Sequence, residues 1–134
     1  MSRPRNTPRT LVYSCSGCSD VAQLANEVAL RLDHGGVAEM SCIAGVGGGV
    51  PGLVRTARSG RPVVAIDGCQ MHCARHCLAN AGVTPTEHVR LHEQGMKKRK
   101  GRLYDEATVE RVTGRVGELI ARLPMEAEAH LEPT

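Results

Sequence analysis

The sequence predicts a single α/β domain, a small three-layer sandwich around a four-stranded, mostly parallel sheet of the Rossmann or flavodoxin-like kind. Short apolar segments alternate four times with longer segments whose apolar residues recur at helical spacing. The length of 134 residues suits one domain. Because crossover connections between parallel strands are right-handed, we expect helices on both faces of the sheet. By analogy with flavodoxin-like folds, we expect the strand order 2-1-3-4.

Four segments carry the strand pattern. The clearest is 63–67, Val-Val-Ala-Ile-Asp, whose β-branched and apolar residues suit a buried strand. The other three strands are expected at 10–15, 37–44 and 87–92. A glycine-rich turn is expected at 45–52, directly after the second strand.

Capping residues mark the expected helices. Ser19 can cap a first helix, which a pair of glycines ends about 16 residues later. Shorter helices are expected at 52–59 and 69–81. Asp105 can cap a last helix with a buried stripe of Val, Leu and Ile, and Pro124 ends it.

The domain is expected to span 10–124, between a disordered basic tail at 1–9 and a disordered C-terminal tail at 125–134. A net charge of +3 and an almost complete lack of aromatic residues argue against a nucleic-acid partner. No run approaches the roughly 20 apolar residues of a membrane helix, and no signal peptide is recognisable. We therefore expect a cytoplasmic protein with no membrane partner, and a protein partner stays open.

Six cysteines are the most informative residues for function. Cys15 and Cys18 form a C-x-x-C directly after the first strand, and Cys42 stands near the end of the second. Cys69 directly follows the third strand, and Cys73 comes four residues later. Because ligands collect at the carboxyl ends of the strands in an open α/β sheet, we expect these thiols at one edge. In a cytoplasmic protein they indicate metal binding or reactive thiols rather than disulfides.

The third predicted helix concentrates further ligands. At 3.6 residues per turn, Cys69, Cys73 and Cys77 fall within about 80° of one another, and His72 and His76 flank the same face. Cys69 is expected at the helix N-terminus, where the helix dipole favours a thiolate. Cys77 lies two turns further on and is expected to be a core residue.

Three kinds of thiol site are compatible with this pattern. Zinc prefers four tetrahedral thiolate or imidazole ligands, and iron–sulfur clusters also use four cysteines. A redox pair would use Cys15 and Cys18 alone. A thiol-dependent reductase or transferase, with this pair or Cys69 as nucleophile, is therefore an alternative to a zinc protein. Whether the chain is an enzyme stays open.

At these residues the chain resembles the DGC-domain family, described as zinc-binding and named after an Asp-Gly-Cys motif, which is Asp67-Gly68-Cys69 here. The resemblance covers residues 10–101. The other stretches that carry it are Cys15-Ser-Gly-Cys18-Ser-Asp-Val-Ala-Gln-Leu-Ala-Asn26, Met40-Ser-Cys42-Ile-Ala-Gly-Val-Gly-Gly-Gly49 with Pro51-Gly52, Cys73-Ala-Arg75, and Gly95-Met-Lys-Lys98.

The resemblance implies that four cysteines chelate zinc, and these map onto Cys15, Cys42, Cys69 and Cys73, with Cys18 as the next candidate. We therefore expect a zinc-binding protein whose site lies at the C-terminal ends of the strands. It would act in metal handling, metal sensing or assembly with a partner. An iron–sulfur cluster is the alternative cofactor.

Several other polar residues are expected to have structural or solvent-exposed positions. Asp67 is expected to cap the third helix or to bond an N–H of the cysteine loop. The basic run in 96–102 is expected to be a solvated loop. His88, His92 and His130 show no ligand spacing and are expected to be exposed.

Overall fold

The computed structural model describes residues 8–96, 98–99 and 103–123. Its sheet has four strands, all parallel, in the order β2-β1-β3-β4. The predicted α/β class and strand order are confirmed. The strands are β1 (Leu11–Ser14), β2 (Glu39–Met40), β3 (Val63–Asp67) and β4 (Glu87–Arg90).

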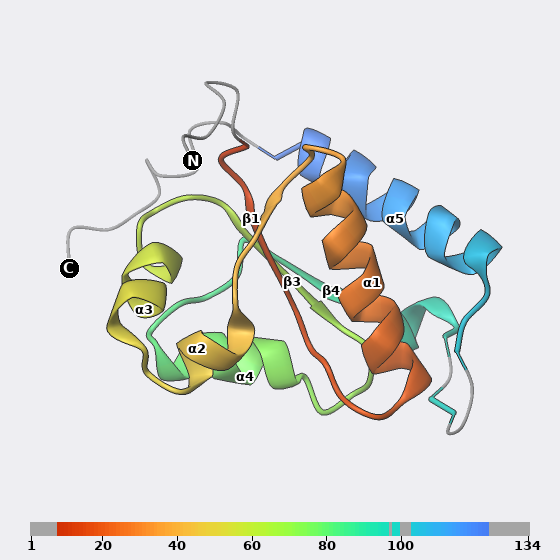
Figure 1. Cartoon of the computed structure of the whole chain (residues 1–134), viewed down its shortest axis with the longest axis horizontal. Coiled ribbons are helices and arrows are strands. Elements are labelled where there is room, and N and C mark those ends of the chain that lie inside the picture. Colours follow the sequence, from red (N-terminus) through yellow and green to blue (C-terminus); the bar gives the residue numbers. More distant parts are fainter. Residues whose placement is uncertain (1–7, 97, 100–102, 124–134) are drawn as a thin grey trace.

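Helices cover the sheet on two sides (Figure 1). On one side lie α1 (Asp20–His34) and α5 (Glu106–Ala121), which pack against each other. On the other side lie α2 (Ile43–Gly47), α3 (Pro51–Ala57) and α4 (Cys73–Asn80). A short 3₁₀ helix, η1 (Leu91–Gln94), follows β4. This arrangement is the three-layer sandwich that the alternating pattern predicts.

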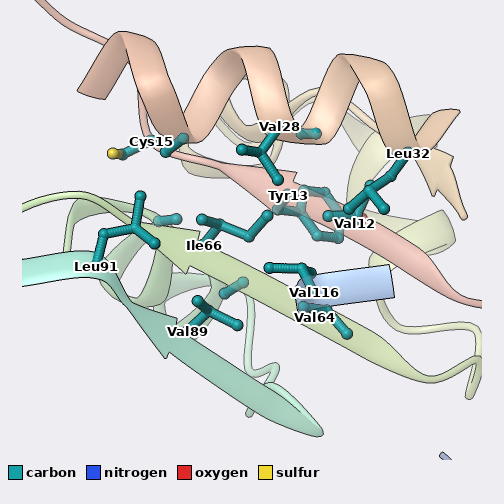
Figure 2. Packing of buried hydrophobic residues seen from close by; sticks show 14 of the residues in the cluster. Val12, Tyr13, Cys15, Val28, Leu32, Val64, Ile66, Val89, Leu91 and Val116 are labelled. Atoms are coloured by element: carbon teal, nitrogen blue, oxygen red, sulfur yellow. The ribbon is translucent and has the colours of Figure 1, made fainter. Parts of the chain in front are cut away.

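The central strands β1 and β3 are buried along their whole length because helices cover both faces. Figure 2 shows the side chains that fill this core, with Leu32 at one end and Cys15, Ile66 and Leu91 toward the other. The end with Cys15 is where β1 and β3 finish. This end of the core therefore adjoins the carboxyl edge of the sheet, where the sequence predicts that the cysteines lie.

The two long helices begin where their capping residues predict. The Ser19 hydroxyl accepts a hydrogen bond from the N–H of Ala22 (3.2 Å), and the Asp105 carboxylate accepts one from the N–H of Thr108 (2.9 Å). Their buried stripes are the predicted apolar residues. These are Val21, Leu24, Ala25, Val28 and Leu32 in α1, and Val109, Val112, Val116 and Ile120 in α5.

The segment after β2 differs from the prediction. β2 covers only Glu39–Met40 instead of 37–44, and residues 43–47 form α2 instead of the strand end and the start of a glycine-rich turn. The sulfur of Cys42 caps this helix by accepting a hydrogen bond from the N–H of Gly45 (3.4 Å). The apolar run around Ile43 reads equally well as a strand, and cysteine is not a usual capping residue, so local sequence could not identify the helix.

Packing against α4 explains why α2 forms. A Cβ added at Gly47 would lie 2.7 Å from the sulfur of Cys77, so the two helices approach over a bare glycine backbone. Such a close approach depends on a residue 30 positions away in the sequence. The side chain of Cys77 is half-buried between the two helices, so it lies outside the main core in which it was predicted.

The third predicted helix begins later than expected. It was predicted over 69–81, but α4 starts at Cys73, and residues 69–72 form a turn in which the N–H of His72 faces the carbonyl oxygen of Cys69 (3.4 Å). His72 itself has the left-handed conformation, with φ of 57° and ψ of 47°, which interrupts the helical run. The expectation that Cys69 shares a helix face with Cys73 and Cys77 is therefore wrong.

The smaller differences concern boundaries. α3 spans 51–57 rather than 52–59, and β4 ends at Arg90 because η1 begins there. The expected terminal tails lie outside the described residues, except for Pro8 and Arg9, whose carbonyl oxygens accept hydrogen bonds from Arg61. No helix within the described residues has both the length and the apolar character that a membrane crossing requires.

The backbone of Gly68 lies so close to α1 that a side chain does not fit. A Cβ at this position would stand 2.5 Å from the carbonyl oxygen of Val21. We expect Gly68→Ala to lower the free energy of unfolding by about 1–3 kcal/mol, the usual cost of overpacking. The measurement is urea denaturation followed by circular dichroism.

Gly114→Ala is the matched control. Gly114 lies within α5, and a Cβ there would meet nothing within 4 Å. It should raise the free energy of unfolding by about 0.5–1 kcal/mol, because alanine is the better helix former. Equal effects of the two substitutions would contradict the steric role assigned to Gly68.

Candidate thiol and histidine site

The turn after β1 and the turn after β3 are joined by a hydrogen bond to sulfur. The N–H of Cys15 donates to the carbonyl oxygen of Ile66 (3.0 Å), which extends the pairing of the strands by one residue. The Cys15 sulfur accepts a hydrogen bond from the N–H of Gly68 (3.2 Å), and only 7% of Cys15 is exposed. The C-x-x-C and Asp-Gly-Cys segments are thus in direct contact at the carboxyl edge of the sheet.

Three thiols lie around this contact. Burial raises the pKa of the Cys15 thiol to about 11; the N–H of Gly68 opposes this shift, while the charges of Asp67, Cys69 and Cys73 add to it. The hydrogen bond from Gly68 to Cys15 places the turn that carries Cys69 beside Cys15, and Cys73 follows at the start of α4. The adjacency of strands 1 and 3 therefore brings together thiols that are more than 50 residues apart in the sequence.

The remaining cysteines have other surroundings. Cys18 is exposed on the turn before α1, and Cys42 is exposed at the start of α2. Burial raises the pKa of the half-buried Cys77, which packs against Gly47. All six cysteines are free thiols.

A complete metal centre is not formed in this conformation. Within the parts of the chain that the structure describes, no three His, Cys, Asp or Glu side chains are grouped closely enough to hold a metal ion. Cys15 is buried and Cys69 is half-buried, whereas Cys18, Cys42 and Cys73 are exposed near the starts of α1, α2 and α4. The donor set itself suits zinc, because thiolates are its preferred structural ligands.

Asp67, the last residue of β3, makes several hydrogen bonds at the same edge of the sheet. Its carboxylate is 1% exposed and accepts hydrogen bonds from the N–H groups of Ala74 (2.8 Å) and Arg75 (3.1 Å). Asp67 therefore caps α4, as predicted, although it stands six residues before the first residue of the helix. These two hydrogen bonds explain why the helix starts at Cys73. The positive end of the helix dipole lies at Cys73 rather than at Cys69.

The carboxylate of Asp67 also contacts a histidine, His88, whose Nε2 lies 2.8 Å from Oδ2. The register of the sheet explains this contact. Ala65 of β3 pairs with His88 of β4, and residues two apart on a strand share a face, so Asp67 and His88 lie on the same side of the sheet.

Two further histidines surround His88. The ring centroids of His72 and His88 are 4.8 Å apart in an edge-to-face arrangement, and those of His72 and His92 are 5.6 Å apart. The expectation that His88 and His92 are exposed is wrong, because only 13% and 25% of their side chains are accessible. His130 lies outside the described residues. Burial and the neighbouring His88 lower the pKa of His72, while the charge of Asp67 opposes the shift.

Sequence reasoning missed this cluster because its members have no common spacing. The signal that could have found it is topological. Once β4 is placed beside β3, the pairing of Asp67 with Arg90 puts His92 level with the turn after β3. Strand order and register together, rather than any local motif, identify the three histidines as neighbours.

The basic segment after η1 is partly anchored rather than solvated. The backbone N–H and the Nε of Arg99 both donate to the Asp20 carboxylate (2.6 Å each), and the N–H of Asp20 donates to the carbonyl oxygen of Arg99 (3.2 Å). Burial by itself raises the pKa of Asp20, but these hydrogen bonds outweigh it and hold that pKa below its ordinary value. The segment is thereby held against the start of α1, two residues after Cys18.

Fold and site together define a small α/β protein with thiols and imidazoles at the carboxyl edge of a parallel sheet. The model of the DGC domain matches residues 11–116, and the chain belongs to the DGC-domain family. The family resemblance noted from the motifs is confirmed.

One curated relative is similar to most of this chain. The chain is 59% identical over 110 residues to a protein of Pseudomonas aeruginosa described as "Anaerobic and virulence modulator AnvM", and the match covers 82% of this chain and 84% of that protein. No solved structure matches the chain.

Removing the Asp67 carboxylate tests its role as a buried cap. We expect Asp67→Ala to lower the free energy of unfolding by about 2–4 kcal/mol, because two backbone N–H groups and His88 lose their acceptor. Asp105→Ala, which removes the exposed cap of α5, should cost only about 1 kcal/mol. Urea denaturation of both variants measures the difference, and a smaller loss for Asp67→Ala than for Asp105→Ala would refute the assignment.

The raised pKa of Cys15 predicts alkaline destabilisation of the metal-free protein. The folded chain keeps this proton up to pH about 11, whereas the unfolded chain loses it near the ordinary value of 9.0. The unfolded state then binds fewer protons, so this stabilising contribution is complete below pH 9 and declines as the pH rises to 11.

Cys15→Ser tests this linkage, because serine keeps an acceptor for the N–H of Gly68 and does not titrate in this range. Its stability should decline less between pH 9 and 11, by on the order of 2 kcal/mol. Burial also raises the pKa of Tyr13, but that contribution is common to both proteins. Parallel stability curves, measured by denaturation in chelator and reductant, would rule the linkage out.

Proposed function

We propose that the chain is a regulatory protein whose thiol site, formed around Cys15, Cys69 and Cys73, binds zinc and controls assembly with a protein partner. The observation that carries the proposal is the hydrogen bond from Gly68 to the Cys15 sulfur, which joins two cysteine-bearing turns. The relative described as a modulator supports a regulatory role rather than a particular reaction.

The chemistry of the donor set supports zinc. Three thiols come from the two joined turns, and Cys42, from the turn before α2, would be the fourth ligand, with Cys18 as the alternative. Metal coordination deprotonates a thiol outright, so a cation would displace the proton that burial and Asp67 keep on Cys15. The N–H of Gly68 would then remain as a hydrogen-bond donor to the ligated sulfur, which is a common form of support for a ligand.

The same observations weaken the enzymatic alternative. A nucleophilic thiol must be ionised near neutral pH, whereas burial raises the pKa of Cys15 to about 11. A dithiol reductase that uses Cys15 as its attacking thiol is therefore disfavoured. Six free cysteines fit a reducing compartment, and a cytoplasmic location forms part of the proposal.

Metal analysis of protein purified without oxygen tests the proposal. We expect about one zinc per chain in the thiol site, and its loss together with a fall in stability in Cys69→Ser and in Cys73→Ser. Cys77→Ser is the matched control, because Cys77 packs against Gly47, and it should keep the metal at a moderate cost in stability.

The outcomes separate the candidate functions. Iron with inorganic sulfide would assign the site to an iron–sulfur cluster instead. Zinc retained in both Cys69→Ser and Cys73→Ser would overturn the ligand assignment. A metal-free protein with one rapidly alkylated thiol would favour the thiol enzyme and overturn the proposal.

A further inference from the structure

The three clustered histidines come from three separate segments of the chain. His72 lies in the turn before α4, His88 in β4 and His92 in η1. Two of their ring nitrogens, Nε2 of His72 and Nδ1 of His92, are buried and have no hydrogen-bond partner among the described residues. A buried polar nitrogen without a partner costs free energy, so two such atoms in one cluster call for an explanation.

His88 is already oriented as a metal ligand would be. In the tautomer that donates to Asp67 Oδ2, the imidazole of His88 carries its proton on Nε2 and has a lone pair on Nδ1. Histidine ligands of metal ions very commonly donate their other nitrogen to a carboxylate in this way.

The backbone of His72 indicates that its position is specifically maintained. A non-glycine residue in the left-handed conformation is strained, and such residues persist where the surroundings hold them, often at functional sites. Here this conformation accompanies the placement of the His72 ring between His88 and His92.

The separations of the rings match those around a single ion. With metal–nitrogen distances of about 2.0–2.1 Å and tetrahedral angles, the centroids of two coordinating imidazoles lie about 5 Å apart. The observed separations from His72 are 4.8 Å to His88 and 5.6 Å to His92.

The three nitrogens do not yet converge, since no group of ligands in the described residues is placed to hold an ion. Convergence requires His72 and His92 to turn about their side-chain torsions. No hydrogen bond of their unpartnered nitrogens would be broken, and the 3.8 Å between Nε2 of His92 and Glu93 is too long for a hydrogen bond. The rotation therefore costs no hydrogen bond at either of these two nitrogens.

We propose that His72, His88 and His92 form a second metal site, for a borderline divalent ion such as Zn²⁺, Co²⁺ or Ni²⁺. Imidazole nitrogen is a suitable ligand for these ions. The site uses none of the cysteines of the thiol site, although His72 directly precedes Cys73 in the chain. The proposal does not rest on the thiol site.

Titration with Co²⁺ in the presence of a reductant tests the proposal. Cobalt bound by thiolates shows a sulfur-to-metal charge-transfer band in the near ultraviolet, whereas cobalt bound by imidazoles shows only visible ligand-field bands. In a Cys69→Ser, Cys73→Ser background, one Co²⁺ should still bind, without the charge-transfer band. Adding His72→Asn and His92→Gln should weaken this binding on the order of 100-fold.

Asparagine is chosen at position 72 because it tolerates the left-handed conformation. The control replaces the same number of exposed histidines, His34→Gln and His76→Gln, and should leave Co²⁺ binding unchanged. If the double variant does not fold, as judged by circular dichroism, His92→Gln alone in η1 provides the test and should weaken binding at least about tenfold.

The possible results are distinct. Equal binding by the cluster variant and the control variant would overturn the histidine site, as would failure of the cysteine-substituted protein to bind Co²⁺ at all. Absence of the charge-transfer band in the protein with all its cysteines would count against the thiol site alone. Failure of one proposal is thereby separable from failure of the other.

Discussion

The edge of this sheet depends on the contact between Gly68, Cys15 and the first turn of α1. Gly68 has no side chain, so the turn after β3 lies directly against the carbonyl oxygen of Val21, and its N–H reaches the Cys15 sulfur. Any larger residue would separate these two turns. Because Asp67 and Cys69 adjoin Gly68, the positions of the helix cap and of the neighbouring thiol both follow from this one approach.

Two buried carboxylates contribute to the electrostatics of this edge. Asp20 and Asp67 are each 1% exposed, and each is compensated by several donors, with Arg99 serving Asp20 and the start of α4 serving Asp67. The charge of Asp67 adds to burial in raising the pKa of Cys15 and Cys77. Burial is the larger cause at both cysteines, so the thiols whose pKa is raised are ones that the fold shields from water.

The parts of the fold that the sequence predicts are those with local causes. β3 was predicted with its observed bounds because Val63–Asp67 is apolar and β-branched. α1 and α5 were predicted because Ser19 and Asp105 are ordinary caps before periodic apolar residues. The strand order was predicted by analogy with flavodoxin-like folds, once the alternation of elements indicated a parallel sheet.

The start of α4 and the existence of α2 could not be predicted in the same way. α4 is capped by Asp67 across an intervening turn, and α2 is capped by the sulfur of Cys42, so neither cap stands where sequence rules look for one. The histidine cluster required the register of β3 against β4. Each of these features depends on contacts between distant residues, whereas the cysteine spacing that pointed to the site is local.

The order of residues in Asp67-Gly68-Cys69 has a physical explanation. The Asp67 side chain points to the face shared with His88 and caps α4, which requires a buried acceptor at the end of the strand. The next residue faces α1, where only glycine fits. The third, Cys69, leaves the strand toward the Cys15 thiol and packs partly against the core. Exchanging any two of the three would put a side chain against Val21 or remove the cap of α4. Packing therefore explains the order of the motif, because only glycine fits beside Val21 and the carboxylate at position 67 caps α4.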